Sequence, residues 1–116
     1  MSLSEHHHHI HYIEFTAPDL DAIKSFYGSV FGWQFQDWGP DYISFEQAGI
    51  AGGFQRGTPV RGAGALVVLF STNLEATDAA VRAAGAPILK PIFSFPGGRR
   101  FHFSDPGGNE LAVWGE

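Results

Sequence analysis

FSFPGGRRFHFSDPGGNELAVW, residues Phe93–Trp114, is the stretch that decides the fold of this chain. Polar and aromatic residues alternate over Arg99–Ser104, which is the period of a strand with one face on an apolar layer. The sequence DPGGN at 105–109 then predicts a turn, because Pro fixes φ and Gly allows positive φ. A second strand follows over Glu110–Trp114, so the stretch is typical of a β-hairpin.

The alternation assigns the side chains of this hairpin to two faces. The apolar face of both strands consists of Phe101, Phe103, Leu111 and Val113. The other face, which is mostly polar, consists of Arg100, His102, Ser104, Glu110, Ala112 and Trp114.

Length and composition narrow the class of protein. A chain of 116 residues with 44% hydrophobic residues forms one domain, or two small modules that share a core. No apolar run approaches the roughly 20 residues that span a membrane, and no signal peptide opens the chain, so we expect a soluble cytoplasmic protein. The absence of cysteine excludes disulfides and thiolate chemistry. The net charge of −5, without a basic run, argues against nucleic acid or an anionic membrane as a partner.

The N-terminal residues 1–9 carry four consecutive histidines, His6–His9. A histidine run at a terminus is typical of a purification remnant or a disordered tail, so we exclude it from any metal site. The folded domain is expected over residues 10–116.

The rest of the chain repeats one order of elements twice. In residues 10–56 an alternating strand precedes a helix, which Asp19 caps and Gly32 ends, and three short aromatic-rich strands follow at 33–38, 42–46 and 50–54. After a Gly-rich linker at 57–64, residues 65–116 give a strand at 66–70, a helix from Leu74 to Ala84, a strand beginning at 88–92 and the hairpin. We therefore predict an α+β fold of two paired βαβββ modules, with curled sheets around a cleft and the helices outside.

Two sets of residues carry a family resemblance. They are Asp19-Leu20, Ser25-Phe26-Tyr27 and Val30-Phe31-Gly32-Trp33 in the first helix, and Ser104-Asp105-Pro106-Gly107-Gly108-Asn109 in the hairpin. Over about residues 10–114 the chain resembles the vicinal oxygen chelate superfamily, which includes glyoxalase I, the bleomycin-resistance proteins and the extradiol dioxygenases. It most resembles short glyoxalase-like bacterial members. The resemblance implies a small-molecule site in the cleft and a homodimer.

The resemblance also implies a divalent metal held by His, Glu or Gln side chains from four strands. Aligned on the two helix caps and on the hairpin turn, the ligand positions fall on Tyr12, Leu66 and Ala112, and near Gly52 and Gly53. None of these is a usual ligand. We therefore expect the fold without the usual metal ligands and no cofactor, with a divalent metal as the alternative.

The same alignments place five polar side chains on the concave face. They are Tyr12, Glu14, Arg100, His102 and Glu110. We predict His102 as a general acid–base group, since its ordinary pKa of about 6.5 is close to neutral, and Glu14 as a second catalytic group. Tyr12, Arg100 and Glu110 are predicted to bind substrate, with Arg100 on a carboxylate or phosphate. The structural alternatives are an internal ion pair of Arg100 with Glu14 or Glu110, and a hydrogen-bonded His102 without a catalytic role.

Four aromatic residues, Trp33, Trp38, Phe54 and Trp114, line the cleft or fill the core, and core packing is the commoner role. The function that fits best is a binding module that captures a small anionic or aromatic molecule. The alternative is a metal-dependent lyase, isomerase or dioxygenase with non-standard ligands such as Glu14, His102 and Glu110. A third possibility is a structural or regulatory role through the dimer surface. Whether the protein is an enzyme stays open at this point.

Overall fold

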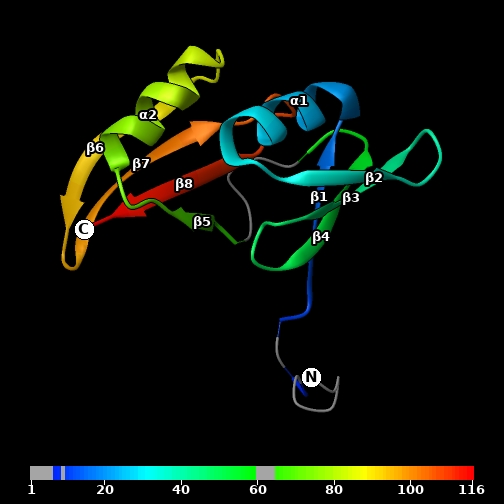
Figure 1. The fold of residues 1–116 in the computed structure, drawn as a ribbon, viewed down its shortest axis with the longest axis horizontal. Helices are drawn as coiled ribbons and strands as arrows, with labels where there is room; N and C mark the ends of the chain where they lie inside the picture. Colours follow the sequence, from blue (N-terminus) through cyan, green and yellow to red (C-terminus); the bar gives the residue numbers. More distant parts are fainter. Residues whose placement is uncertain (1–6, 9, 60–64) are drawn as a thin grey trace.

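The computed structural model describes residues 7–8, 10–59 and 65–116. Its elements follow one another as βαβββ twice, which confirms the predicted α+β fold of two modules (Figure 1). The first module contains β1 (Tyr12–Ala17), α1 (Leu20–Phe31), β2 (Gln34–Asp37), β3 (Tyr42–Glu46) and β4 (Ala51–Arg56). The second contains β5 (Val67–Phe70), α2 (Leu74–Ala83), β6 (Ile88–Phe95), β7 (Gly98–Ser104) and β8 (Glu110–Gly115). The predicted tail, except for residues 7 and 8, and linker residues 60–64 lie outside the described residues.

Each module forms one four-stranded mixed sheet. The strand orders are β1-β4-β3-β2 and β5-β8-β7-β6, and the first strand of each module pairs in parallel with the last. All other neighbouring strands are antiparallel. The helix α1 contacts β2 and β4, whereas α2 contacts β7 and β8, so each helix covers one face of its own sheet and leaves the other face free for a site. No helix in the described ranges is long and apolar enough to cross a membrane.

Both helices begin where their capping residues predict; α1 also ends at its predicted residue, and α2 ends at Ala83, one residue before its predicted limit. The Asp19 carboxylate accepts a hydrogen bond from the Ala22 amide at 3.1 Å, and the Asn73 side chain accepts one from the Ala76 amide at the same distance. Gly32 ends α1 with φ of 75°, in the left-handed region that favours glycine. The first helix is therefore held between the two residues that the sequence marks as its limits.

The apolar face of the β7–β8 hairpin enters a core that spans both modules. Phe101, Phe103 and Leu111 are fully buried, as the alternation predicts. The ring of Phe103 lies 5.8 Å from that of Phe26 and 6.0 Å from that of Phe31, both on α1. One helix of the first module thus packs on the sheet of the second, which joins the modules into one hydrophobic unit.

The turn between β7 and β8 makes a second connection between the modules. Asp105 is 3% exposed, and its carboxylate accepts hydrogen bonds from the Tyr27 hydroxyl at 2.9 Å, from the Gly107 and Asn109 amides at 2.9 Å each, and from the Asn109 side chain. The same Asn109 side chain donates to the Thr16 carbonyl at 3.0 Å. Burial raises the pKa of Asp105, and these hydrogen bonds oppose that shift. The residues of the DPGGN motif therefore have a structural role: they hold the turn and connect the two modules.

Some strand limits differ from the prediction. β2 begins one residue after Trp33, because this indole stacks on Tyr27 in the core at 4.4 Å between ring centroids. β4 continues to Arg56, which donates to the Pro18 and Pro40 carbonyls. β6 continues to Phe95 through Pro91, with two register shifts against β7. Among the four aromatic residues considered above, Trp33 and Phe54 are core residues.

Candidate functional site

The five predicted site residues lie on two different sheets. Tyr12 and Glu14 belong to β1, whereas Arg100, His102 and Glu110 belong to β7 and β8. The strand register places each group on the sheet face that the helices leave free. Within these two groups, His102 and Glu110 bond directly to each other, and no hydrogen bond or ion pair of the described residues joins one group to the other.

His102 and Glu110 form a hydrogen-bonded pair. His102 is 3% exposed, and its Nδ1 lies 2.9 Å from Oε2 of the half-buried Glu110. A carboxylate only accepts, so Nδ1 is assigned the proton and, in the neutral ring, Nε2 carries the lone pair. That Nε2 is buried and has no hydrogen-bond partner among the described residues. The pair therefore orients an imidazole whose second nitrogen is left for another group.

Arg100 lies two residues before His102 on the same face of β7. Its guanidinium carbon is 5.4 Å from the ring centroids of both Phe93 and Phe95, which is a cation–π contact with two rings. Its Nε is buried and has no hydrogen-bond partner within the described part of the chain. The internal ion pair with Glu14 or Glu110, considered from the sequence, is not among the ion pairs of the described residues. The neighbouring Arg99 points to the helix side and pairs with Glu75 of α2. This agrees with the strand alternation, which puts Arg99 and Arg100 on opposite faces of the sheet.

A pocket of about 330 Å³ lies beside Arg100, and we call it the second-sheet pocket. It is lined by Val68, Phe95, Gly97, Arg100 and Trp114. Arg100 is the one charged side chain among these described lining residues, and the walls are otherwise apolar. This combination suits an anion attached to an apolar body.

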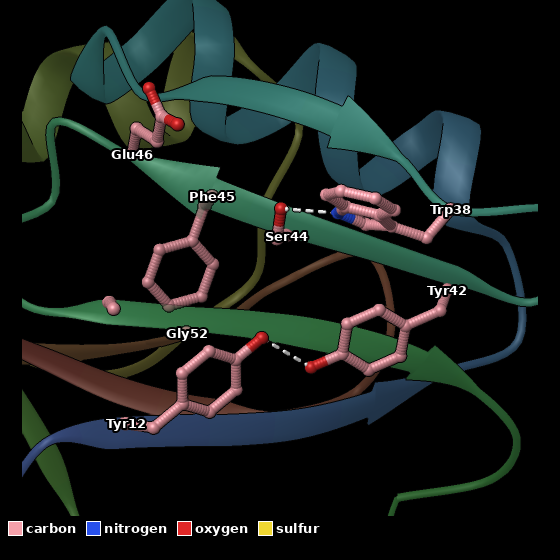
Figure 2. A pocket seen from close by; sticks show the side chains of 8 residues that line it. Tyr12, Trp38, Tyr42, Ser44, Phe45, Glu46 and Gly52 are labelled. Atoms are coloured by element: carbon pink, nitrogen blue, oxygen red, sulfur yellow. Dashed lines mark hydrogen bonds between the residues drawn. The ribbon is translucent and has the colours of Figure 1, made fainter.

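The first sheet carries a larger pocket of about 520 Å³, which we call the first-sheet pocket. Its lining residues are Tyr12, Trp38, Tyr42, Ser44, Phe45, Glu46, Ala51 and Gly52 (Figure 2). The Tyr12 and Tyr42 hydroxyls are 2.6 Å apart, and the Trp38 indole donates to the Ser44 hydroxyl at 2.8 Å. Partial burial, the Tyr12 hydroxyl and the Glu14 carboxylate raise the pKa of Tyr42, so its phenol stays neutral near pH 7.

Gly53 explains how the two phenols meet. Tyr12 is on β1 and Tyr42 on β3, and β4 lies between these strands. A Cβ on Gly53 would stand 2.5 Å from the Tyr42 hydroxyl oxygen, so only glycine lets this ring cross the strand. Tyr42 and Ser44 were not predicted from the sequence as pocket residues. The available signal was the glycine pair inside a strand, which often marks the close approach of another group.

The described residues do not fit the divalent metal that the resemblance implies. They contain no group of three or more His, Asp or Glu side chains placed to hold an ion. Tyr12, at the first aligned ligand position, bonds to Tyr42, and Ala112, at the last, has no donor atom. The non-standard set of Glu14, His102 and Glu110 is divided between the two sheets.

Comparison with known proteins places the chain in a family. The model of the Glyoxalase/Bleomycin resistance protein/Dioxygenase superfamily matches residues 9–113. A family enzyme of this type from Burkholderia phytofirmans is 18% identical, with a TM-score of 0.78 over 90% of this chain and 95% of that chain. A glyoxalase-related enzyme from Fulvimarina pelagi is 23% identical, with a TM-score of 0.76 over 92% of this chain and 87% of that chain.

A genomically encoded fosfomycin resistance protein from Listeria monocytogenes has the same fold. It is 15% identical, with a TM-score of 0.79 over 92% of each chain. No curated protein matches the chain significantly. The solved structures share the fold at low identity, and the family model covers nearly the whole chain, so this protein belongs to the glyoxalase/bleomycin resistance protein/dioxygenase superfamily.

Proposed function

We propose that the protein binds a small anionic molecule with an aromatic or other apolar body in the second-sheet pocket. The observation that carries this proposal is the pair of buried nitrogens, Arg100 Nε and His102 Nε2, of which Arg100 belongs to the pocket lining. They lie two residues apart on one strand face, and neither has a partner among the described residues. Because a buried polar group without a partner destabilises the fold, such groups point to a ligand that completes their hydrogen bonds.

The chemistry of the lining defines the class of ligand. The guanidinium of Arg100 presents a planar fork that matches a carboxylate or phosphonate, and the rings of Phe93 and Phe95 restrict its orientation. Val68 and Trp114 offer an apolar wall beside the charge. His102 is not among the described lining residues, so its Nε2 accepts a hydrogen bond only from a ligand hydroxyl that extends beyond them, while Glu110 holds the ring.

One structural neighbour is in line with an anionic ligand. A variant of the Listeria monocytogenes fosfomycin resistance protein was solved with Mn(II) and 1S,2S-dihydroxypropylphosphonic acid. That protein shares only the fold with this chain, at 17% identity for that structure. The support is therefore an analogy, and the residues named above carry the proposal. Catalytic roles for His102 and Glu14 and a substrate-binding role for Tyr12 stay predictions.

Replacing Arg100 with glutamine should weaken binding of 1-naphthoate, a simple aromatic anion, by about 10- to 100-fold. Hydrogen bonds to charged groups contribute about 1.5 to 3 kcal/mol, and each 1.4 kcal/mol is tenfold in affinity. Arg100→Lys should recover part of the affinity, because it keeps the charge and loses the fork. Isothermal titration calorimetry measures the three dissociation constants.

Arg99→Gln is the matched control. It removes the same charge from the adjacent residue, but that side chain pairs with Glu75 on the helix side. The Arg99 variant should bind 1-naphthoate as the unchanged protein does. Equal affinity of all variants, or no saturable binding by the unchanged chain, contradicts the proposed function.

We also propose that the chain forms a homodimer and that it acts in the cytoplasm. The free face of the second sheet carries Val68, Phe70 and Trp114, and Phe70 is 55% exposed with its ring tilted against that of Trp114 at 5.0 Å between centroids. This apolar surface continues into the second-sheet pocket, and a second copy of the chain would cover it. Sedimentation velocity should show a dimer that Phe70→Glu converts to monomer. A chain that is monomeric at all concentrations contradicts the dimer and leaves the ligand proposal intact.

A further inference from the structure

The first-sheet pocket exposes aromatic side chains that the proposed function does not use. Trp38 is 63% exposed and Tyr12 is 44% exposed, although both side chains donate or accept hydrogen bonds that hold them in place. Figure 2 shows these rings together with Tyr42, and the alternation along β1 and β3 places Tyr12 and Tyr42 on the same face of the sheet. Ordered and exposed aromatic rings around a pocket of about 520 Å³ are typical of a site for a flat molecule.

The charges on this face are all negative among the described residues. Glu46 lines the pocket, and Glu14 lies on the same face of β1, opposite Gly53. No lysine or arginine is among the described lining residues. The lysine and arginine nearest in sequence are occupied elsewhere: Lys24 pairs with Asp37, and Arg56 pairs with Asp41. The potential over the pocket is therefore set by carboxylates and by the electron-rich faces of aromatic rings.

The two pockets thus have opposite character. The second-sheet pocket contains one arginine and no acidic lining residue, whereas the first-sheet pocket contains an acidic lining residue and no basic one. Aromatic faces attract organic cations through the ring quadrupole, and carboxylates add to this attraction. Anions are repelled by the same groups.

We propose that the first-sheet pocket is a second binding site, specific for a planar aromatic cation. The cation stacks on Trp38 and Tyr42, and Glu14 and Glu46 balance its charge. The hydroxyl pair of Tyr12 and Tyr42 and the Ser44 hydroxyl supply hydrogen-bonding groups at the floor. Gly53 makes this site possible, because it lets Tyr42 lie across β4.

Three probes of similar ring size and different charge test the proposal. N-methylquinolinium is a cation, quinoline is neutral near pH 7, and 1-naphthoate is an anion. Isothermal titration calorimetry on the full chain should show saturable binding of N-methylquinolinium. Trp38→Ala should weaken this binding by about tenfold, as expected for the loss of a ring that stacks on a cation. Glu14→Gln combined with Glu46→Gln should weaken binding of the cation and leave the affinity for quinoline unchanged.

Two matched controls separate this site from the rest of the protein. Asp21→Asn removes one exposed carboxylate from α1, on the helix side of the sheet, and should leave the affinity for N-methylquinolinium unchanged. Arg100→Gln should weaken binding of 1-naphthoate by about 10- to 100-fold without affecting binding of the cation, so the failure of one site does not imply the failure of the other. Trp38→Ala and the double Glu variant should keep the thermal midpoint of the unchanged chain.

Specific outcomes overturn the proposal. It is wrong if N-methylquinolinium shows no saturation, or if Trp38→Ala binds it as tightly as the unchanged chain. It is also wrong if quinoline or 1-naphthoate binds at Trp38 as tightly as the cation does. Finally, it is wrong if Asp21→Asn lowers the affinity for the cation as much as the double Glu variant does. Each of these results would show that the first-sheet pocket is not a selective site for an aromatic cation.

Discussion

Replacing Asp105 with alanine is expected to lower the free energy of unfolding by about 3 kcal/mol or more, because it leaves several buried donors without an acceptor. The Tyr27 hydroxyl and the amides of Gly107 and Asn109 all donate to this carboxylate. Each unsatisfied buried donor destabilises a protein by about 1 to 3 kcal/mol, and the effects are not additive. Urea unfolding followed by circular dichroism at pH 7 measures the loss.

Asp41→Ala provides the matched control. This aspartate also accepts from another side chain, Arg56, but its own side chain is 73% exposed, so the loss should stay near or below about 0.5 kcal/mol. A loss at Asp105 no larger than the loss at Asp41 would show that the turn does not hold the modules together.

Tyr27→Phe tests the hydrogen bond between the Tyr27 hydroxyl and Asp105 through the pH dependence of stability. Burial raises the pKa of Asp105 above its ordinary 3.8, so the stability contributed by this carboxyl group is complete below that value and falls as pH rises through the folded pKa. The Tyr27 hydrogen bond opposes this rise in pKa, and its removal raises the pKa further. The variant should therefore lose little stability near pH 4 and about 1 to 2 kcal/mol at pH 7. A difference that does not grow with pH would contradict the role of Tyr27.

Phe103→Ala should lower the free energy of unfolding by about 3 to 5 kcal/mol, which is the usual effect of removing a fully buried ring. Phe103 has no exposed surface and lies against Phe26 and Phe31 of the other module. The resulting cavity would open where α1 meets the second sheet. Denaturant unfolding monitored by tryptophan fluorescence and by circular dichroism measures the loss and shows whether the modules still unfold together.

Phe103→Leu and Ile10→Ala calibrate this result. Leucine fills part of the same space and should destabilise the protein less than alanine does. Ile10 is 77% exposed, so its truncation should change the stability by no more than about 0.5 kcal/mol. If Phe103→Ala destabilises the chain no more than Ile10→Ala, the shared core is not what joins the modules.

The candidate site shows where prediction from sequence reaches its limit. The alternation over Arg99–Ser104 assigned Arg100 and His102 to one face, and the register of β7 and β8 confirms that assignment. The partners of these side chains were not predictable. Arg100 contacts Phe93 and Phe95, and His102 pairs with Glu110, because strand pairing and two register shifts decide which side chains meet.

Of the residues that line the first-sheet pocket, the sequence predicted only Tyr12 as a substrate-binding residue. Tyr12 and Tyr42 are 30 positions apart in the sequence, and their strands flank β4. Their hydroxyls meet because the Tyr42 ring crosses β4 at Gly53. Trp38 was considered for a pocket, but nothing in its surroundings in the sequence distinguished it from Trp33, which is buried. Exposure of an aromatic residue depends on which neighbours cover it, and local patterns do not contain that information.

By itself, the sequence determined the elements of this protein and their order. Hydrophobic periodicity, helix caps and turn residues act over a few positions, so they can be read from neighbouring letters, and they predicted both βαβββ modules. The tertiary structure alone decided which polar groups share a pocket, which buried nitrogens lack a partner, and that Asp105 joins the modules through Tyr27. These properties arise from contacts between residues distant in the chain, whose geometry depends on how the sheets and helices pack.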